Sequence, residues 1–439
     1  MPPLTTPATL DRGVARRRAA EGAAYGVQFW FTYAANTCLM AAVSLLFRYA
    51  DFVHVLGGTD WHLGWIVGIG MFGSLAIRLV QGVGIDRWGS RQMWVWSIAL
   101  FSASCLGHLT VDRVDNFQIF AWRVLFNTSI AGAFGASITY ISRQAPVIRM
   151  AEIVGTLGTS GFVGMVAGPW IGDFLLGGSF RGTAPLERAD LNRLFMVAAA
   201  MGVCAFVLAN LATWGHVHPA KRRKPHVLWL LRRYHPGPVL LVAVVMGFGI
   251  GLPGVFLRPY AAQLNISKIA MFFTVYSCMA FITRICIRRF PEKFGIRPMI
   301  LWGLASLITS MLLYLVVRQP WQLQLPAIFT GIAHAFLFPA VVAGGSASFP
   351  SRHRGVGTAL MLAMFDLGSL LGMPTVGEIL RRAAQAGLDP YPTMFICVAA
   401  VLTLSAAIYW LLSRNEPPWA GRRRGRLEPL AIPAEGLAS

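Results

Sequence analysis

Long apolar runs separated by short polar gaps are the dominant pattern along this chain. Each run holds about 20 mainly apolar residues, the length that an α-helix needs to cross a hydrocarbon layer ~30 Å thick. The pattern predicts an all-α membrane protein with about 12 transmembrane helices. The expected spans are 25–47, 62–85, 93–111, 117–141, 153–176 and 194–217, followed by 238–257, 269–287, 299–317, 323–349, 355–380 and 394–412.

The longest gap between runs is basic and lies almost at the centre of the chain. It contains Lys221, Arg222, Arg223, Lys224, Arg232 and Arg233, and we interpret it as the boundary between two pseudo-symmetric six-helix bundles. Such a run is typical of an anchor to anionic lipids, although it could also bind a partner. The expected organisation is a cytoplasmic N-terminal tail (1–24), an N-terminal bundle (25–217), a basic cytoplasmic linker (218–237), a C-terminal bundle (238–413) and a cytoplasmic C-terminal tail (414–439).

Composition agrees with lipid as the solvent of this chain. Of its 439 residues, 56% are hydrophobic and 13% are charged, which is too apolar for a typical soluble protein of this size. The formal charge of +20 does not indicate nucleic-acid binding, because the basic residues lie in gaps between apolar runs rather than on one polar domain. The six cysteines fall inside apolar stretches without CxxC or histidine spacing, so we expect neither disulfides nor a metal site.

The positions of Lys and Arg predict the orientation in the membrane, because short basic loops resist translocation. With the N-terminus inside, the inner segments hold 25 of the 38 Lys and Arg residues, and the outer segments hold 10, Arg48 among them. The first 23 residues are polar and lack the apolar core of a cleavable signal peptide. We therefore expect a multi-pass protein of the plasma or inner membrane with both termini cytoplasmic.

The two halves share a repeat at a nearly constant offset. The loop DRWGSR at 86–91 and the loop EKFGIR at 292–297 have the same order of acid, base, aromatic, glycine and arginine, 206 residues apart. The same offset places Arg78 on Arg284. An offset of 204 places Pro146, Gly164 and Gly168 on Pro350, Gly368 and Gly372. Such duplication predicts two similar bundles with a cavity between them near the bilayer midplane.

The first loop, with the residues before it, resembles the loop-2/3 signature of the major facilitator superfamily of membrane transporters. That signature has a glycine, then Asp-Arg, then a second glycine and a basic residue, as in GVGIDRWGSR at 82–91. The chain departs from it at Ser90, where the family has a basic residue, and at Arg288, which replaces the first glycine in the second copy. The resemblance implies that Asp86 and Glu292 latch one half against the other in the outward-facing state, whereas a merely positive-inside loop is the alternative. Further gating candidates in these loops are Arg87, Arg91 and Lys293.

Span five is similar to the antiporter signature of the superfamily. The residues that carry this similarity are Gly155, Gly164, Gly168, Pro169 and Gly172. Glycines at these spacings lie on one helix face and allow close helix contact, so we expect a helix-packing motif. Packing alone is the alternative to a transport-specific role, and the resemblance favours export over import. The stretch Asp366-Leu367-Gly368 and its surroundings resemble bacterial efflux-type members of the superfamily.

Five ionisable side chains are expected deep in the membrane, where a charge is costly and usually functional. They are Arg78, Arg123, Arg284, His334 and Asp366. Arg78 lies about 12 Å and Asp366 about 16 Å above the cytoplasmic face at ~1.5 Å rise per residue, and in the superfamily spans two and eleven face each other. We therefore predict an ion pair between Arg78 and Asp366 that joins the halves, with bonding of Arg78 to carbonyls of its own half as the alternative.

The resemblance also implies candidate solute contacts, because spans one, four, seven and ten line the cavity in the superfamily. These candidates are Asn36, Arg123, Asn127 and His334. Arg123 falls where the family has an arginine associated with proton coupling, although Phe126 and Asn127 replace the usual Gln-Gly. A structural role between helices is the alternative for each candidate. Proton coupling, where present, is expected to use Asp366 or His334.

The sequence therefore predicts a secondary active transporter of a small organic solute that works by alternating access. Export is the expected direction, and proton antiport is a further hypothesis. Because the chain shows no Walker A motif and no nucleophile or metal cluster of a membrane enzyme, we expect neither a pump nor an enzyme, and no cofactor. The expected partners are the solute, protons and membrane lipids, with no nucleic acid, in a monomer. The alternative function is a transport-inactive scaffold or sensor.

Overall fold

The computed structural model describes residues 25–145, 149–176, 186–215, 234–288, 290–350 and 353–415. All regular secondary structure within these ranges is helical, which confirms the predicted all-α class. The predicted N-terminal tail, the predicted C-terminal tail after Asn415 and most of the basic linker lie outside the described residues.

Each of the twelve predicted spans coincides with a long helix. The first half contains α2 (Val27–Leu45), η1 (Leu46–Arg48), α3 (Tyr49–Val55), α4 (Asp60–Trp88), α5 (Ser90–Gly107), α6 (Phe117–Gln144), α7 (Met150–Leu176) and α8 (Arg188–Ala212). The second half contains α10 (Val239–Gln263), α11 (Ala270–Cys286), α12 (Phe290–Phe294), α13 (Ile296–Leu313), α14 (Gln324–Ala347), α15 (Arg354–Gln385) and α16 (Pro390–Leu412). Ten of the helical stretches in the described part of the chain are long and apolar enough to cross a membrane, and α11 is a shorter apolar helix.

Helix ends differ from the prediction most clearly in the first span. The sequence predicts that this span ends at Phe47, but α2 continues through η1 into α3 and ends at Val55. Arg48, expected in an outer loop, is therefore inside a helical stretch and is 2% exposed. The reason is that apolar residues resume directly after Arg48, so the backbone stays helical around one charged side chain.

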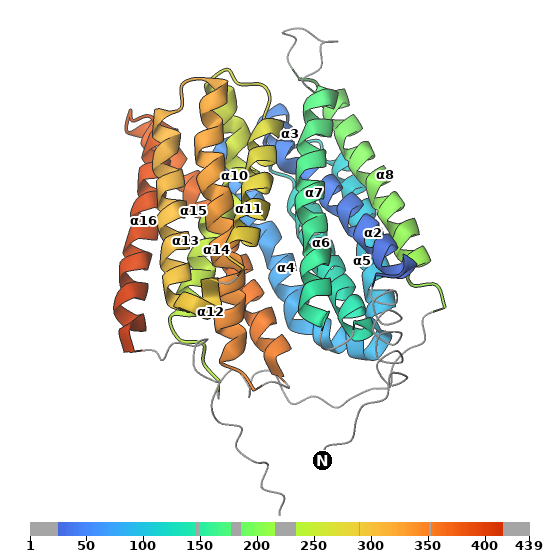
Figure 1. Ribbon diagram of the computed structural model, residues 1–439. Helices are drawn as coiled ribbons and strands as arrows, with labels where there is room; N and C mark the ends of the chain where they lie inside the picture. The colour runs from blue at the N-terminus through green and yellow to red at the C-terminus, as the bar shows by residue number, and fades with distance from the viewer. Residues whose placement is uncertain are drawn as a thin grey trace, which may run out of the picture.

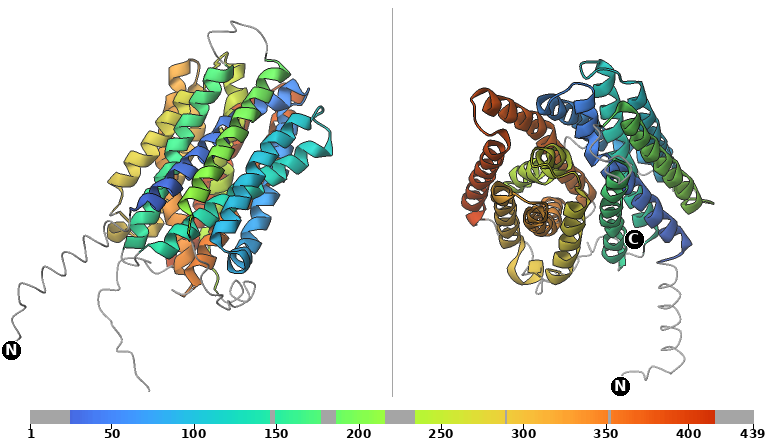
Figure 2. Two further views of the ribbon diagram at one scale, coloured as in Figure 1. Left: turned by 90° about the vertical axis from the view of Figure 1, so that its right-hand side faces the viewer. Right: turned by 90° about the horizontal axis from the view of Figure 1, so that it is seen from above.

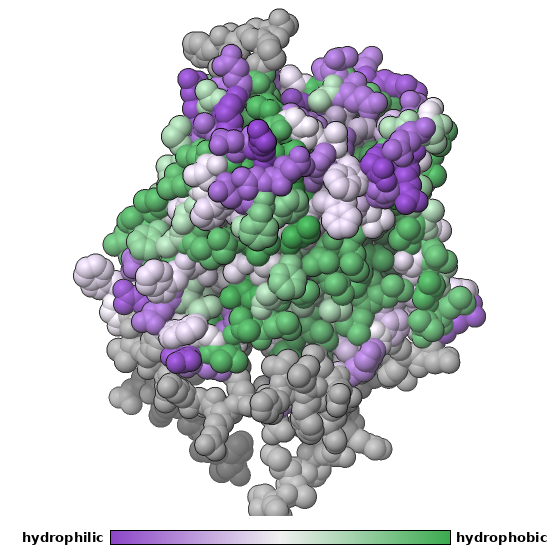
Figure 3. All heavy atoms as spheres, turned by 180° about the vertical axis from the view of Figure 1, so that it is seen from behind, coloured by the Kyte–Doolittle hydropathy of each residue, from purple (hydrophilic) through white to green (hydrophobic). Residues whose placement is uncertain are grey.

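The helices form two bundles that lie side by side, as the view from above in Figure 2 shows. One bundle contains α2 to α8 and the other contains α10 to α16 (Figure 1). We call the side on which α2 begins and α16 ends the termini side, and the opposite side, on which α3 lies, the far side. An apolar belt crosses the face seen in Figure 3 between these two sides. Large exposed side chains of this kind include Phe72, Trp96, Phe174, Trp302 and Leu404.

The sequence repeat is also a structural repeat. Helix α4 ends at Trp88 and α5 begins at Ser90, with Gly89 between them at φ +90°. In the second half α13 begins directly after Gly295, which has φ +83° and lies 206 residues later. Glycine adopts this left-handed backbone without the steric cost of a Cβ. The two loops therefore make the same reversal in the same way.

Glycines bring corresponding helices into close contact in the two halves. A methyl group on Gly168 of α7 would overlap the Ala41 carbonyl of α2, and one on Gly368 of α15 would overlap the Val244 carbonyl of α10. Gly164 packs on α2 in the same way, whereas Gly172 makes ordinary contacts with Leu45 and Arg48, and Pro169 continues the helix. Gly155 has open space at its Cβ position, so it takes no part in the contact in this conformation.

Two pairs of helices form the boundary between the bundles. Helix α4 packs along α15, and α7 packs along α11. These pairs correspond to each other in the repeat, because α4 matches α11 and α7 matches α15. Arg78 lies on α4, Arg284 on α11 and Asp366 on α15.

Candidate functional site at the boundary between the halves

An ion pair between Arg78 of α4 and Asp366 of α15 joins the two bundles. Arg78 Nε donates to Asp366 Oδ2, and Ser74 Oγ donates to the same oxygen at 2.6 Å. Ser74 and Arg78 are four residues apart, so they lie on one face of α4. The Arg78 side chain is 17% exposed and that of Asp366 is 5% exposed. The structure thus places together the two groups that the sequence predicts to meet.

The second boundary, between α7 and α11, contains an arginine in a different environment. The guanidinium carbon of Arg284 lies 4.8 Å from the ring centroid of Phe162 of α7 and 5.9 Å from that of Phe338 of α14. Arg284 Nε is buried and has no hydrogen-bond partner among the described residues. These ring contacts stabilise a cation only weakly compared with a carboxylate.

His334 of α14 lies next to this arginine within a group of rings. His334 Nδ1 shares a hydrogen bond of 2.7 Å with the Tyr276 hydroxyl of α11. The His334 ring also packs 5.7 Å from Phe162 and 5.5 Å from Phe338, centroid to centroid. Phe162 belongs to the N-terminal bundle and the other rings belong to the C-terminal bundle. His334 therefore lies at the boundary between the bundles, where a residue predicted to contact the solute must lie.

Four charged side chains form a neutral cluster nearer the far side, which we call the far-side ion cluster. Its members are Arg48, Asp51, Asp173 and Arg258. Arg48 Nη2 lies 2.7 Å from Asp173 Oδ1, and Arg48 Nη1 lies 3.0 Å from Asp51 Oδ2. Arg258 of α10 donates from Nε to Asp51 Oδ2 at 3.0 Å, which links the two bundles. The four side chains are between 2% and 12% exposed.

Asp173 also caps a helix of the opposite bundle. Its Oδ2 accepts hydrogen bonds from the backbone nitrogens of Ile269 at 2.9 Å and Ala270 at 2.8 Å, where α11 begins. The first amides of a helix have no partner within the helix, and a carboxylate there also complements the positive end of the helix dipole. Arg48 Nη2 additionally donates to the Ser267 carbonyl at 2.7 Å. The far-side ion cluster therefore fixes the start of α11 to the end of α7.

Sequence reasoning missed the far-side ion cluster. Arg48 was expected among the outer loop charges because the first span was ended at Phe47. The available signal was the spacing of Arg48 and Asp51, which lie one helical turn apart in an apolar surrounding. The link to Asp173 and Arg258 had no signal in the sequence, because these residues are more than 100 positions away.

The candidate residues of the N-terminal bundle are held by partners of their own bundle. Asn36 donates to the Ser137 hydroxyl of α6 at 3.1 Å, and Asn127 donates to the Arg123 carbonyl at 3.3 Å. The Arg123 guanidinium carbon lies 4.3 Å from the Tyr49 ring centroid, and the side chain is 8% exposed. Arg123 Nε and Nη1 are buried and have no hydrogen-bond partner among the described residues, so solute contact stays a prediction for Arg123 and Asn127.

The predicted latch residues lie at the termini side. Asp86 pairs with Arg143 of α6 in its own bundle, with 3.7 Å between Oδ1 and Nη2. Arg87 is exposed and lies over the ring of the adjacent Trp88 at 5.7 Å. The remaining loop candidates are half-buried Arg91, exposed Lys293, and Glu292 in α12, whose side chain is outside the described part.

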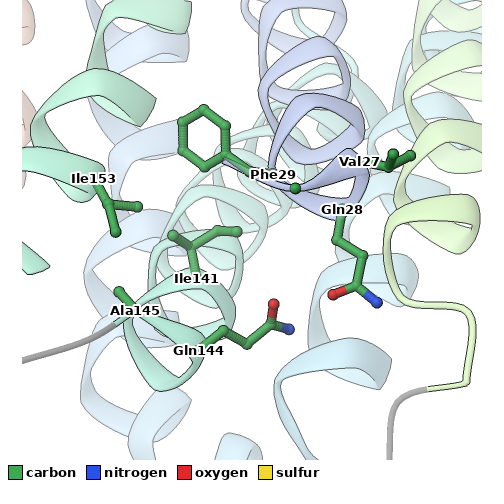
Figure 4. A pocket seen from close by; sticks show the side chains of 8 residues that line it. Val27, Gln28, Phe29, Ile141, Gln144, Ala145 and Ile153 are labelled. Carbon is green, nitrogen blue, oxygen red and sulfur yellow. The ribbon is translucent and has the colours of Figure 1, made fainter. Parts of the chain in front are cut away.

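Two cavities lie outside the charged clusters. The smaller, of about 150 Å³, lies between the termini-side ends of α2, α6 and α7 within one bundle, with Gln28 and Gln144 beside it (Figure 4). The larger, of about 760 Å³, is a groove along the α4–α15 boundary, where Phe72 and Leu371 are exposed. Within the described residues there is no group of three or more side chains suited to hold a metal ion.

The arrangement of charges sets what the site can do. Asp366 is a buried carboxylate whose negative charge holds Arg78, so removal of that charge would weaken one link between the bundles. Arg284 is a half-buried cation at the other boundary. The far-side ion cluster joins the two bundles through Asp51 and Arg258, so the far side can open only when these charges separate.

A family model described as Major Facilitator Superfamily matches residues 27–320 and 239–435 of the chain. Multidrug resistance protein MdtG of Salmonella paratyphi A is 25% identical over 353 residues, which cover 74% of this chain and 78% of that protein. A protein of Agrobacterium vitis described as a tartrate transporter is 30% identical over 118 residues, or 27% of this chain. That match spans only 25% of the tartrate relative's length.

Solved structures show the same fold at low sequence identity. The nucleoside transporter NupG superposes with a TM-score of 0.71 and 14% identity, over 89% of this chain and 100% of NupG. Both bundles are therefore included in the match.

Proposed function

This chain belongs to the major facilitator superfamily, and from that premise we propose that it is a secondary active exporter of a small organic solute that works by alternating access. Members of the superfamily are membrane carriers rather than enzymes. Export is supported by the glycine motif of α7 and by the match to a multidrug resistance protein over most of both chains. The termini side is the cytoplasmic side in this proposal, since basic loops gather there.

The observation that carries the proposal is the Arg78–Asp366 ion pair. Such a pair inside the apolar belt is expensive unless both charges stay together, and it connects two bundles that must move relative to each other in alternating access. In this proposal the ion pair is formed in one conformation of the carrier and broken in the other. A scaffold that only needed rigidity would be served at least as well by apolar contacts.

The conformation described is the one with the far side closed. In the proposed cycle the far-side ion cluster breaks when the carrier opens outward, and the termini side then closes. Asp86 and Glu292 serve as latches in that outward-facing state, so the pairing of Asp86 with Arg143 of its own bundle is the released position. Arg87, Arg91 and Lys293 add further charge at the two latch loops.

Protons are the proposed coupling ion, with Asp366 as the group that takes them up. Protonation would remove the charge that holds Arg78, so that proton entry and separation of α4 from α15 occur together. His334 is the second candidate, but its hydrogen bond to Tyr276 lies within the C-terminal bundle. Its protonation therefore changes less between the bundles than that of Asp366.

Vesicles reconstituted with purified protein test the proposal. Salicylate, an organic acid, and ethidium, a cationic dye, are supplied to vesicles with an imposed pH gradient, and their accumulation is followed over time. We expect accumulation of at least one probe that depends on the gradient and is lost in Arg78→Ala. Gradient-independent equilibration of both probes at the rate of empty vesicles would support the scaffold alternative instead.

A further inference from the structure

The internal repeat makes a specific comparison between the two boundaries possible. The offset of 206 relates Arg78 to Arg284, and the offset of 204 relates Asp366 to position 162. Position 162 is Phe162, and its ring is in fact the nearest aromatic contact of Arg284, at 4.8 Å. The second boundary therefore keeps the arginine of the repeated pair, but it has an apolar ring where the first boundary has the carboxylate.

Arg284 is consequently a cation without a matching anion. None of the ion pairs among the described residues includes it, and its buried Nε makes no hydrogen bond. Its near neighbours are the Tyr276 hydroxyl and the His334 ring, which are neutral hydrogen-bonding groups. Arg284 is half-buried on a helix within the apolar belt, and a charge there without an opposite charge is costly and points to a functional site.

We propose that Arg284 binds the carboxylate of an organic anion, and that the apolar body of this anion packs between Phe162 and Phe338. This inference rests on the proposed transport function and names the class of solute. The carboxylate takes the place that Asp366 occupies at the other boundary. Two N–H groups of the guanidinium can bind two carboxylate oxygens side by side.

The surroundings select the kind of anion. A single arginine balances one negative charge, so a monocarboxylate suits the site better than a doubly charged phosphate ester. The three rings of Phe162, Phe338 and His334 favour an aromatic or aliphatic body over a sugar, because burial of apolar surface is favourable and unpaired hydroxyls are penalised. Tyr276 and His334 offer hydrogen-bonding groups to one polar substituent beside the carboxylate.

Binding at Arg284 would also act on the conformation. The anion contacts α7 through Phe162 and α11 through Arg284, so it joins the two bundles as Asp366 and Arg78 do on the opposite boundary. Solute binding thus supplies a link that the empty carrier lacks. The site would hold its solute most tightly in states where α7 and α11 stay close.

Ligand binding to the purified protein tests the inference without relying on transport. Salicylate is compared with salicyl alcohol, which has the same ring and hydroxyl but no charge. We expect salicylate to raise the melting temperature of the wild-type protein and salicyl alcohol to raise it much less. Arg284→Gln should weaken salicylate binding about tenfold to hundredfold, as for the loss of a charge-assisted hydrogen bond, and Arg284→Lys should retain part of it. Arg288→Gln, an exposed arginine four residues later, is the matched control and should bind as wild type.

Replacement of Phe162 supplies a second test that needs no particular ligand. Phe162→Asp restores the carboxylate of the repeat, so it should pair with Arg284 and abolish salicylate binding while the protein stays folded. Phe162→Asn has the same size without the charge and should be less stable than Phe162→Asp. That difference should disappear in an Arg284→Gln background.

Three results would overturn the inference: equal binding of salicylate and salicyl alcohol or binding of neither, unchanged binding in Arg284→Gln, or equal stability of Phe162→Asp and Phe162→Asn. None of them bears on whether the vesicles show transport. Absence of flux together with Arg284-dependent binding would refute the transport function and leave the anion site in place. Flux of other probes without Arg284-dependent binding would do the reverse.

Discussion

Arg78 and Arg284 occupy equivalent positions in the repeat, yet the surroundings of their charges differ. Arg78 meets a carboxylate and a serine that binds the same oxygen, whereas Arg284 lies over two aromatic rings. The carboxylate of Asp366 therefore compensates the charge of Arg78 within the protein. Removal of one member of that pair leaves the other charge in the apolar belt without compensation.

Single substitutions at this pair should therefore harm the protein more than their combination. Arg78→Ala and Asp366→Ala are each expected to destabilise the folded state by about 3–5 kcal/mol, and the double variant by clearly less than their sum. The measurement is a double-mutant cycle on thermal stability and on transport rate. Arg382→Ala, on the same helix α15 but 75% exposed, is the control. Strictly additive effects would rule out a coupled pair.

The Arg78–Asp366 pair was predictable from the depth of both residues in the membrane. The far-side ion cluster was not predictable. The counts of residues from Arg78 and Asp366 to the cytoplasmic loops gave similar heights, and the family arrangement placed their helices face to face. For Arg48, the predicted span ended directly before it, at Phe47, whereas the helical stretch continues to Val55. Burial of that side chain depends on partners from α7 and α10, which no local pattern reveals.

At the scale of elements, the closed far side depends on the contact between the end of α7 and the start of α11. Asp173 neutralises Arg48 and accepts from two backbone amides of α11 at once. An asparagine at this position can still accept from an amide but cannot balance the Arg48 charge. The charge, not the shape, of Asp173 thus holds the two elements together.

Asp173→Asn should shift the conformational equilibrium toward an open far side. A single cysteine at Thr274, whose hydroxyl accepts from Trp170 across the boundary at 2.9 Å, reports on this contact in an otherwise cysteine-free chain. We expect its labelling by a membrane-impermeant thiol reagent to become about tenfold faster, which corresponds to a shift of about 1.4 kcal/mol. Asp389→Asn is the matched control, because Asp389 precedes α16 and makes no side-chain cap. Equal labelling in both variants would show that the cluster does not control closure.

The helices themselves were predictable because each must present about 20 apolar residues to lipid. The helix ends were less predictable, since a helix can continue beyond its most apolar residues, and α4 and α15 extend beyond the predicted spans at both ends. The glycine motif of α7 correctly marked the contact with α2 at Gly164 and Gly168. The motif could not show that the Cβ position of Gly155 faces open space in this conformation.

At the scale of the whole molecule, the repeat makes the two boundaries comparable. One has a complete ion pair, and the other has an arginine without an ion-pair partner among the described residues. Duplicated bundles begin with equivalent surfaces, so any difference between their boundaries reflects later specialisation. In the proposed mechanism the α4–α15 boundary, which has the carboxylate of Asp366, takes the proton. The α7–α11 boundary, which has Arg284, takes the solute. Separate sites on opposite boundaries would let proton and solute each change the contact between the same two bundles.

Loss of the Arg78–Asp366 ion pair should separate proton coupling from solute exchange. The double variant Arg78→Gln with Asp366→Asn replaces the ion pair by two neutral groups that can still hydrogen-bond, so the fold should be retained. Because no titratable group then joins α4 to α15, we expect solute exchange across vesicles without a gradient to continue within about threefold of the wild-type rate, while accumulation driven by a pH gradient is lost. The matched comparison is His334→Gln, which removes the other deep titratable group and should keep pH-driven accumulation, although with weaker solute binding. Should the double variant still concentrate its solute with the pH dependence of the wild type, the proton path does not run through Asp366; loss of pH dependence in His334→Gln alone would then move it to the second boundary, beside Arg284.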